Sequence, residues 1–418
     1  MITTKRAGEG HHAQALEGVV VLDLAGALGN YCSKLFADLG ADVILVEPLA
    51  GAPTRSLVPK IKGRDDIESS LVFQYQNTNK RSIVLDLDTP EAQDVLRALI
   101  KNAHVLIESE QPGVMERRGL GYEVLRKIAP GLVMTSITPF GQDGPYADWL
   151  GSDLVGMAMG GMLYLAGYKD TAPMVAFGEQ AIGAANLFAA VATMAAFYDA
   201  EVTGSGQHID VSMQESIVMG MENAVQFYDL EGTIRKRNAG EQRLAGTGVF
   251  QCKDGYVYLM AGGVGGNRFW ADTTQWLIDE GLERAEELKE PCWHDNDYLA
   301  SASAKTRFTE IFSSFALAQT KAQMQEKGRV RRIPIAPICD TSDLNKSEQR
   351  KYRGYFIDVA ASDGTSLGMP GAPYRLSQTP WLVKCGAPRL GQHTKEILRS
   401  MGINSAQERA LESKGCVR

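Results

Sequence analysis

Short apolar segments alternate with amphipathic segments along the first third of the chain. The apolar segments are rich in β-branched residues, which predicts strands, and the segments between them have the apolar spacing of helices. One helix is expected to begin after Thr89, because a capping threonine followed by Pro90 is a typical start. Short apolar strands separated by helices indicate an α/β fold with a doubly wound parallel sheet. The expected strands are residues 18–24, 42–47, 82–86, 104–107 and 132–137, and the expected helices are residues 31–39, a segment from 89, and 122–128.

A long segment without charged side chains, residues 180–198, follows this region. Its length is close to that of a bilayer span. It is rich in alanine and contains Gly183 and Asn186, so it is only weakly hydrophobic on an insertion scale. We therefore expect a helix buried in the core of a large soluble protein, and no membrane association.

The pattern changes again in the second half of the chain. Residues 207–212 are expected to form a strand, helical spacing continues to about residue 230, and residues 246–260 indicate a hairpin around Lys253-Asp254-Gly255. Helices are expected to about residue 328. The pattern predicts three parts: residues 1–230 as the N-terminal part of a large Rossmann-like domain, residues 231–330 as a small α+β domain, and residues 331–418 as a return linker (331–337) and a C-terminal part that completes the large domain.

Composition and charge narrow the class of function. The chain has 418 residues, 44% hydrophobic and 22% charged, with a formal net charge of -7, which argues against nucleic acid or anionic lipid as a partner. Its six cysteines include no C-x-x-C pair, so neither a disulfide framework nor a zinc site is indicated. The polar N-terminal segment lacks the apolar core of a secretory signal. We expect a cytoplasmic protein that acts on small molecules and holds no metal.

A glutamate stands directly before the long uncharged segment, in Phe177-Gly178-Glu179-Gln180. At the start of a helix, the helix dipole is expected to favour an ionised, nucleophilic carboxylate. Glu179 is therefore the leading candidate for a catalytic residue, and the alternative is that it only caps the helix. The turn Gly26-Ala-Leu-Gly29-Asn30 lacks the spacing of a dinucleotide-binding fingerprint, so a dehydrogenase is not indicated.

Seven ordered segments resemble the class III CoA-transferase family, which includes the formyl-CoA and carnitine CoA-transferases. The resemblance implies a large Rossmann-like domain built from both chain ends, a small middle domain, and two ring-shaped subunits interlocked like chain links. The segments are Val21-Leu-Asp-Leu24, Ala37-Asp-Leu-Gly-Ala-Asp-Val43 through Glu47, Asn79-Lys-Arg-Ser-Ile83, Gly119-Leu-Gly-Tyr122, Phe140-Gly-Gln-Asp-Gly-Pro145, Gly204-Ser-Gly-Gln-His-Ile-Asp-Val-Ser212 and Leu390-Gly-Gln-His-Thr394.

The resemblance also implies a reaction. In the family an aspartate after a glycine attacks an acyl-CoA thioester to give a mixed anhydride and then an enzyme-bound CoA thioester, and this position is Glu179 here. Glutamate is one methylene longer, and a misplacement of about 1 Å can cost about a hundredfold in rate. Coenzyme A thioesters enter as substrates, and no permanently bound cofactor is implied. The coenzyme A-binding positions implied are Arg55, Asn79, Lys80, Arg81, Leu85, Ser109, Arg117 and Gly141.

Several positions depart from the family pattern. Asp88 stands where a basic residue is usual, and Ser109-Glu110 stands where asparagine-phenylalanine is usual. Two acids beside a polyanionic ligand are repulsive. The plainer explanation of these substitutions is sequence drift around a site that binds coenzyme A by backbone contacts. The other interpretation is a chain relieved of catalysis by a paralogous subunit that supplies the aspartate, as in the succinyl-CoA:benzylsuccinate CoA-transferases of anaerobic toluene degradation.

Two further hypotheses remain at this point. In the first, the chain is a self-sufficient homodimeric CoA-transferase that uses Glu179. In the second it is an α-methylacyl-CoA racemase, but Ser152 stands where the racemase histidine should precede Asp153, and proton abstraction without a positioned base is implausible. His208 is expected to be a packed structural histidine.

Overall fold

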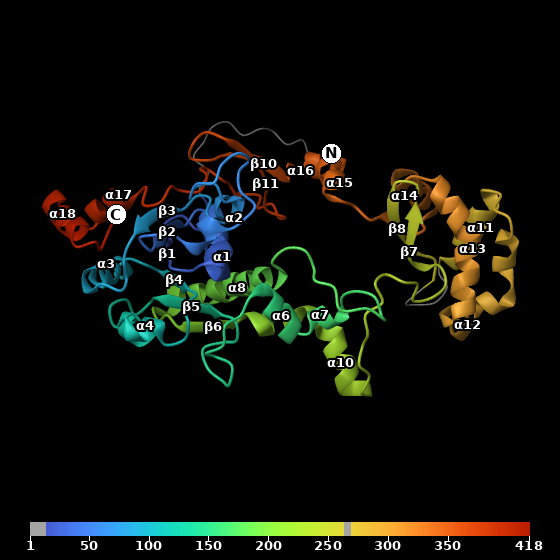
Figure 1. Cartoon of the computed structure of the whole chain (residues 1–418), viewed down its shortest axis with the longest axis horizontal. Helices are drawn as coiled ribbons and strands as arrows, with labels where there is room; N and C mark the ends of the chain where they lie inside the picture. Colours follow the sequence, from blue (N-terminus) through green and yellow to red (C-terminus); the bar gives the residue numbers. More distant parts are fainter. Residues whose placement is uncertain (1–13, 263–268) are drawn as a thin grey trace. The chain divides into compact units, whose positions relative to one another are not determined.

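The computed structural model describes residues 14–262 and 269–418 (Figure 1). The chain forms two compact units. The first contains residues up to Tyr164 together with Val175–Arg235 and Arg353–Arg418, and the second contains Leu165–Met174 and Lys236–Tyr352. The expected boundaries at residues 230 and 330 stay predictions about independently folding domains.

A parallel sheet of six strands forms the centre of the first unit, in the order β3-β2-β1-β4-β5-β6. This is the order of a doubly wound Rossmann-like sheet, which confirms the predicted fold class. The order reverses between β1 and β4, so the loops that follow these two strands lead to opposite sides. The strands are β1 (Val20–Asp23), β2 (Asp42–Glu47), β3 (Arg81–Val84), β4 (Val105–Glu108), β5 (Val133–Thr138) and β6 (His208–Ser212).

Both faces of the sheet are covered by helices. Val21 and Val105 point to one face, where they pack with α1 (Ala27–Asp38) and α8 (Gln180–Thr203). Leu22 and Leu106 point to the other face and pack with α3 (Pro90–Ile100) and the C-terminal helices. Because neighbouring residues of a strand point to opposite faces, both are buried, which explains why the strands are apolar throughout. The C-terminal helices are α17 (Thr394–Ser400) and α18 (Ser405–Ser413).

Helix α8 is buried on one face only, which corrects the expectation of a helix enclosed in a core. Ala181, Ala185 and Ala189 are buried against α1 and β5. On the outward face Val191 is 70% exposed and Tyr198 72%. By length and composition alone α8 could cross a membrane. In the structure it carries a buried stripe of small residues and an exposed apolar stripe.

Shorter elements complete the first unit. The segment after β6, expected to be one helix, consists of α9 (Met213–Val218), a 3-10 turn η2 (Met219–Met221) and α10 (Glu222–Glu231). The others are η1 (Pro53–Ser56), α2 (Leu71–Gln76), α4 (Val114–Arg117), α5 (Tyr122–Leu125), α6 (Asp153–Met159), α7 (Met162–Leu165), and the antiparallel pair β10 (Phe356–Ala360) and β11 (Ser366–Pro370).

The second unit is an antiparallel sheet of three strands packed against helices, as the α+β prediction requires. Its strands are β7 (Thr247–Cys252), β8 (Gly255–Met260) and β9 (Ile335–Pro337), in the order β7-β8-β9. Residues 331–337 were expected to be a linker. This was wrong for β9, because its backbone pairs with β8 and Ile335 is buried in the core of this unit.

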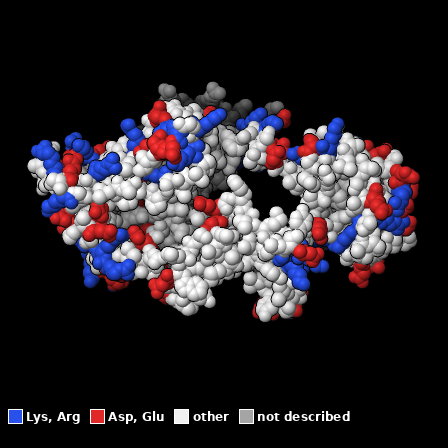
Figure 2. Space-filling model, viewed as in Figure 1, with Lys and Arg blue, Asp and Glu red and all other residues white. Residues whose placement is uncertain are grey.

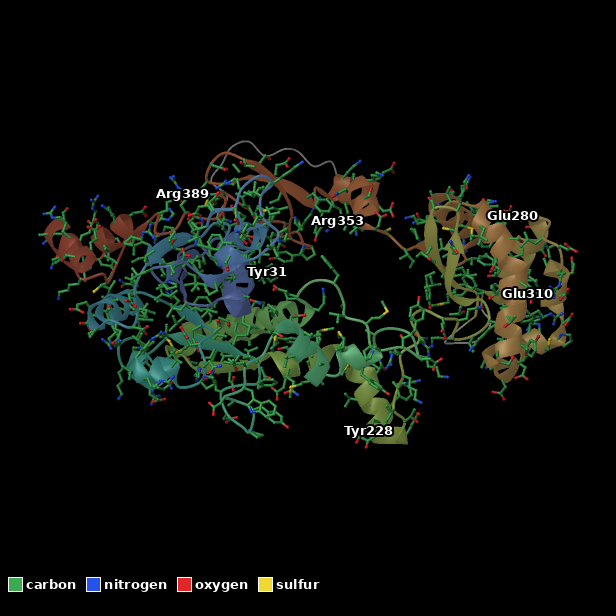
Figure 3. All side chains as sticks on the ribbon, in the orientation of Figure 1. Tyr31, Tyr228, Glu280, Glu310, Arg353 and Arg389 are labelled. Carbon is green, nitrogen blue, oxygen red and sulfur yellow. The ribbon has the colours of Figure 1, made fainter. Side chains whose placement is uncertain are left out.

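Aromatic side chains fill that core, with Trp276 and Trp293 fully buried. Glu280 and Glu310, labelled in Figure 3, form ion pairs with Lys327 at 2.7 Å and Arg284 at 3.1 Å. The helices of this region are α11 (Trp270–Asp279), η3 (Ala285–Lys289), η4 (Pro291–His294), α12 (Asn296–Ala300), α13 (Ala302–Ala318), α14 (Lys321–Arg331), α15 (Thr341–Lys346) and α16 (Glu348–Arg353).

Candidate active site

Glu179 lies at the start of α8, after Gly178, whose φ of 86° is in the left-handed region that glycine adopts readily. The Glu179 side chain accepts no hydrogen bond from the first turn of the helix. The acceptor is Asp153 instead, whose Oδ1 receives the backbone N–H groups of Ala181 at 2.7 Å and Ile182 at 3.0 Å. Asp153 therefore satisfies two of the amides that a helix start leaves unpaired.

This arrangement reverses the expected charge behaviour of Glu179. Burial raises the pKa of its carboxyl above the usual value, and the negative charge of Asp153 raises it further. Both effects oppose the expected influence of the helix dipole, which favours the ionised carboxylate. Partial burial is the larger cause, and Asp153, which occupies the amides, adds a negative charge beside Glu179.

Beside Glu179 the first unit has a hollow of about 700 Å³. Glu179, Gln180 and Ser216 contribute the polar side chains of its lining, and the remainder is apolar or glycine. Such a lining suits the apolar body of a small organic acid whose polar end faces the carboxyl group. The apolar and glycine residues are Met162, Gly183, Ala184, Leu187, Phe188, Val191, Ile217, Met219 and Gly220.

A second feature is the reversal point of the sheet, where doubly wound proteins bind ligands outside the carboxyl ends of the strands. The loops after β1 and β4 meet here, because the Gly26 N–H donates to Ser109 Oγ at 2.9 Å. Asn186 connects α8, the helix of Glu179, to α1, which follows the loop after β1. Its Oδ1 accepts from Cys32 N at 2.9 Å, and its Nδ2 donates to Ala27 O at 3.1 Å.

Two of the expected coenzyme A-binding cations are enclosed in the first unit. Arg55 and Lys80 are each 1% exposed. Arg55 pairs with Glu47 and Glu68, both at 2.6 Å, and Lys80 pairs with Asp23 at 2.9 Å. These side chains balance buried carboxylates, which would be costly to leave unpaired. A role in binding coenzyme A stays a prediction.

Three more candidates lie along β3 and face the C-terminal part of the chain. Asn79 Nδ2 donates to Asp38 at 2.7 Å and to the Leu382 carbonyl at 2.8 Å. Arg81 pairs with Asp42 at 2.5 Å. Leu85 is buried and forms a backbone bridge with Val417. In the structure these residues join the chain ends into one unit, and any contact with coenzyme A stays a prediction.

The remaining candidates follow strands β4 and β5, two of them on loops and Arg117 at the end of α4. Ser109 follows β4, and Gly141 follows β5, where its N–H donates to Thr138 Oγ1 at 2.9 Å. Arg117 is exposed and forms no ion pair with any residue in the described ranges. Ser109, Arg117 and Gly141 are therefore the candidates best placed to meet a ligand.

The acids that seemed repulsive share a counterion. Arg118 pairs with Asp88 at 2.8 Å and with Glu110 at 2.9 Å. Arg118, the capping role of Asp153 and the bridging role of Asn186 were not predicted. In the sequence, the Ser152-Asp153 pair resembles a helix start. Asn186 is noticeable because it is a polar residue within an apolar helix. Which amides and carboxylates they meet depends on the tertiary fold.

Comparisons with known proteins agree over nearly the whole chain. The model of CoA-transferase family III matches residues 16–394. Succinyl-CoA:(R)-benzylsuccinate CoA-transferase subunit BbsE of Thauera aromatica is 38% identical over 403 residues, covering 95% of this chain and 97% of that protein. Succinyl-CoA–L-malate CoA-transferase beta subunit of Chloroflexus aurantiacus is 31% identical over 410 residues, covering 96% and 97%. A CAIB/BAIF family protein from Brucella suis has a solved structure with a TM-score of 0.82 and 27% identity, covering 93% of this chain and 99% of that chain.

Proposed function

The chain belongs to CoA-transferase family III and is an enzyme of that class, and on this premise we propose that it transfers coenzyme A from succinyl-CoA to a carboxylic acid such as benzylsuccinate. We further propose that it is the subunit of a hetero-oligomer that lacks the usual catalytic aspartate. The observation that carries this is Glu179 itself. The family resemblance implies that it occupies the position of the aspartate, and its side chain makes no capping hydrogen bond to the helix and has a raised pKa.

The chemistry explains why that observation matters. A carboxylate attacks the thioester carbonyl and expels the thiolate of coenzyme A, which leaves a mixed anhydride on the enzyme. The thiolate then attacks the enzyme carbonyl and releases the first acid, and the acceptor carboxylate repeats the two steps in reverse. Every cycle requires an ionised nucleophile. The longer side chain weakens Glu179 in this role, because a misplacement of about 1 Å can cost about a hundredfold in rate, so an aspartate from another chain is the better nucleophile.

The partner proposed is a paralogous subunit. The outward face of α8 is apolar, and Figure 2 shows few charged side chains over α6 and α7 in the same unit. Large exposed apolar patches on soluble proteins mark interaction sites. Two of the similar proteins are named as subunits. These observations support an assembly of unequal chains, and the interlocked arrangement implied by the family belongs to the same proposal.

We place coenzyme A at the reversal point of the sheet in this proposal. Ser109 lies on the loop after β4, Arg117 ends α4, and Gly141 follows the neighbouring strand β5. These three would meet the ligand, with Arg117 able to pair with a phosphate. The other expected positions would stabilise the same region through the contacts described above. They are Arg55, Asn79, Lys80, Arg81 and Leu85. The hollow beside Glu179 would take the apolar part of the acceptor acid.

The test uses hydroxylamine, which traps acyl-enzyme intermediates as hydroxamates. The chain expressed alone and incubated with succinyl-CoA should give no Glu179 hydroxamate. Activity should appear on co-expression with a paralogue that carries aspartate, and E179Q in that complex should keep activity within about threefold. A Glu179 hydroxamate in a complex of this chain alone would contradict the proposal.

That contrary result would favour the self-sufficient homodimer, for which one observation speaks: Glu179 does face the hollow. In a homodimer that uses Glu179, E179Q should abolish activity. E179D should restore the family geometry and change the rate by about tenfold to a hundredfold, because the carboxyl moves by about 1 Å. Native mass spectrometry of the protein from its natural source would identify the assembly.

A further inference from the structure

Four polar side chains lie close together on three neighbouring strands. They are Glu108 on β4, Ser136 on β5, and His208 and Asp210 on β6. Ser136 is the register partner of both Glu108 and Asp210. Registered residues of parallel strands point to the same face, and so do residues two apart along one strand. The four side chains therefore share a face, where the ring of Tyr122 stacks on His208 at 5.6 Å.

Ser136 stands between Glu108 and His208. Its Oγ lies 2.8 Å from His208 Nε2, and it is the register neighbour of Glu108, whose pKa the Ser136 side chain lowers as a hydrogen-bond donor. Glu108 and Ser136 are 2% and 1% exposed. Burial raises the pKa of Glu108 to about 7 and lowers the pKa of His208 below its usual value. A buried carboxyl group and a neutral imidazole thus share one hydroxyl group.

Glu108 and Asp210 each hold a loop. Glu108 Oε2 accepts the Glu110 N–H at 2.7 Å, in the loop after β4. Asp210 Oδ2 accepts the Gln142 N–H at 2.9 Å, in the loop after β5. These loops carry Ser109 and Gly141.

We propose that Glu108 and His208, joined by Ser136, form a proton-linked hydrogen-bond chain whose state positions the loop after β4 for coenzyme A. The link to coenzyme A rests on the proposed function, whereas the hydrogen-bond chain of Glu108, Ser136 and His208 does not. Glu108 and His208 are positioning residues here, because neither is required to touch the substrate.

The chain has two states that differ by one proton. When Glu108 is ionised, the Ser136 hydroxyl donates to it, and Ser136 Oγ accepts from the Nε2–H of neutral His208. When Glu108 takes a proton from solvent, its O–H donates to Ser136 Oγ and the Ser136 hydroxyl donates to Nε2. His208 must then give its Nε2 proton to solvent and take one at Nδ1. Protonation of Glu108 thus switches the tautomer of His208.

Protonation also weakens the hold on the loop. A carboxylate accepts a charge-assisted hydrogen bond from the Glu110 N–H, and such bonds are about twice as strong as neutral ones. Other charged groups face the chain. Glu110 and Glu116 raise the pKa of Glu108 further, and Asp210 and Glu116 oppose the lowering of the pKa of His208. We therefore expect the switch near neutral pH.

The first test is nitrogen NMR of the full chain labelled at histidine. His208 should change from the Nε2–H to the Nδ1–H tautomer as the pH falls from about 8.5 to about 6. His104 is an internal control, because its Nδ1 accepts the Val20 N–H at 3.0 Å, which keeps its proton at Nε2. E108Q and S136A should each abolish the change. A single His208 tautomer throughout would overturn the proposal.

The second test measures the affinity for coenzyme A by calorimetry between pH 6 and 8. In the unchanged protein, affinity should fall by about threefold to tenfold at the lower pH, because one charge-assisted bond becomes neutral. E108Q should remove this part of the pH dependence. Equal pH dependence in both proteins would overturn the link to the loop after β4. No binding at any pH would contradict the proposed coenzyme A site. The His208 tautomer measurement would still test the hydrogen-bond chain of Glu108, Ser136 and His208.

Discussion

At the scale of single residues, Asp153 strongly affects the electrostatic environment of Glu179. Glutamate at a helix start would ordinarily be stabilised as an anion, and this was the prediction from the sequence. In the structure the helix amides bond to Asp153, which lies 28 positions before Ala181, and Glu179 lines a largely apolar hollow and has a raised pKa. The charge of Asp153 therefore opposes the effect of the helix dipole on Glu179.

Substitutions at Asp153 separate its two effects. D153A should destabilise the first unit by about 0.5–2 kcal/mol, the usual cost of a lost helix cap. D153N keeps the accepting oxygen and removes the charge, so it should cost less and should lower the pKa of Glu179. Carbodiimide coupling requires a protonated carboxyl group, and its pH midpoint at Glu179 can be followed by peptide mass spectrometry. The midpoint should move to lower pH in D153N and stay unchanged in D148N, a control at an exposed acid.

At the scale of elements, α8 serves two surfaces at once. Its alanines allow close packing against α1 and β5, while its larger apolar side chains point outward. A helix with an apolar stripe on each side would expose one of them in an isolated chain, which is costly in water. This is the physical reason for proposing that another subunit covers it.

Introducing a charge on the outward stripe tests that interpretation. V191K should weaken the assembly at least tenfold, about 1.4 kcal/mol, because the lysine would be buried in an apolar interface. L317K is the matched control, since Leu317 is 49% exposed on α13 in the other unit. Sedimentation or native mass spectrometry provides the measurement. An unchanged assembly in V191K would show that this face of α8 is not at the interface.

At the scale of the whole molecule, the first unit is closed by contacts between distant parts of the chain. Asn79 Oδ1 accepts the backbone N–H groups of Lys384 at 2.7 Å and Cys385 at 3.1 Å. His393 N donates to the Ser82 carbonyl at 2.9 Å. The C-terminal residues therefore add to the edge of the sheet formed by β3.

Loss of this connection should destabilise the first unit. N79A removes the acceptor of two backbone N–H groups and one donor to Asp38, so unfolding free energy should fall by about 1–3 kcal/mol. N102A, at an exposed asparagine, should change it by less than about 0.5 kcal/mol. Denaturant unfolding measures both. Equal stabilities would mean that the C-terminal segment is held by its other contacts.

Local patterns predicted most of the elements. The strand at residues 42–47 and the strands of the hairpin at 246–260 agree closely with β2, β7 and β8, because apolar alternation and a turn at Lys253-Asp254-Gly255 are local signals. β9 was missed, because a strand of three residues flanked by prolines has no periodicity to detect. β9 is a strand because its backbone pairs with β8, and this pairing depends on the tertiary structure.

The class of fold, the family, and the place of Glu179 before a long apolar helix follow from the amino-acid sequence, since these depend on spacing and on the order of segments. Which charges meet depends on the tertiary structure. It enclosed Arg55 and Lys80 among carboxylates, joined Asp88 and Glu110 through Arg118, and placed Asp153 on the amides of α8. Charge pairing and burial depend on distances between residues far apart in the chain, and no local pattern contains them.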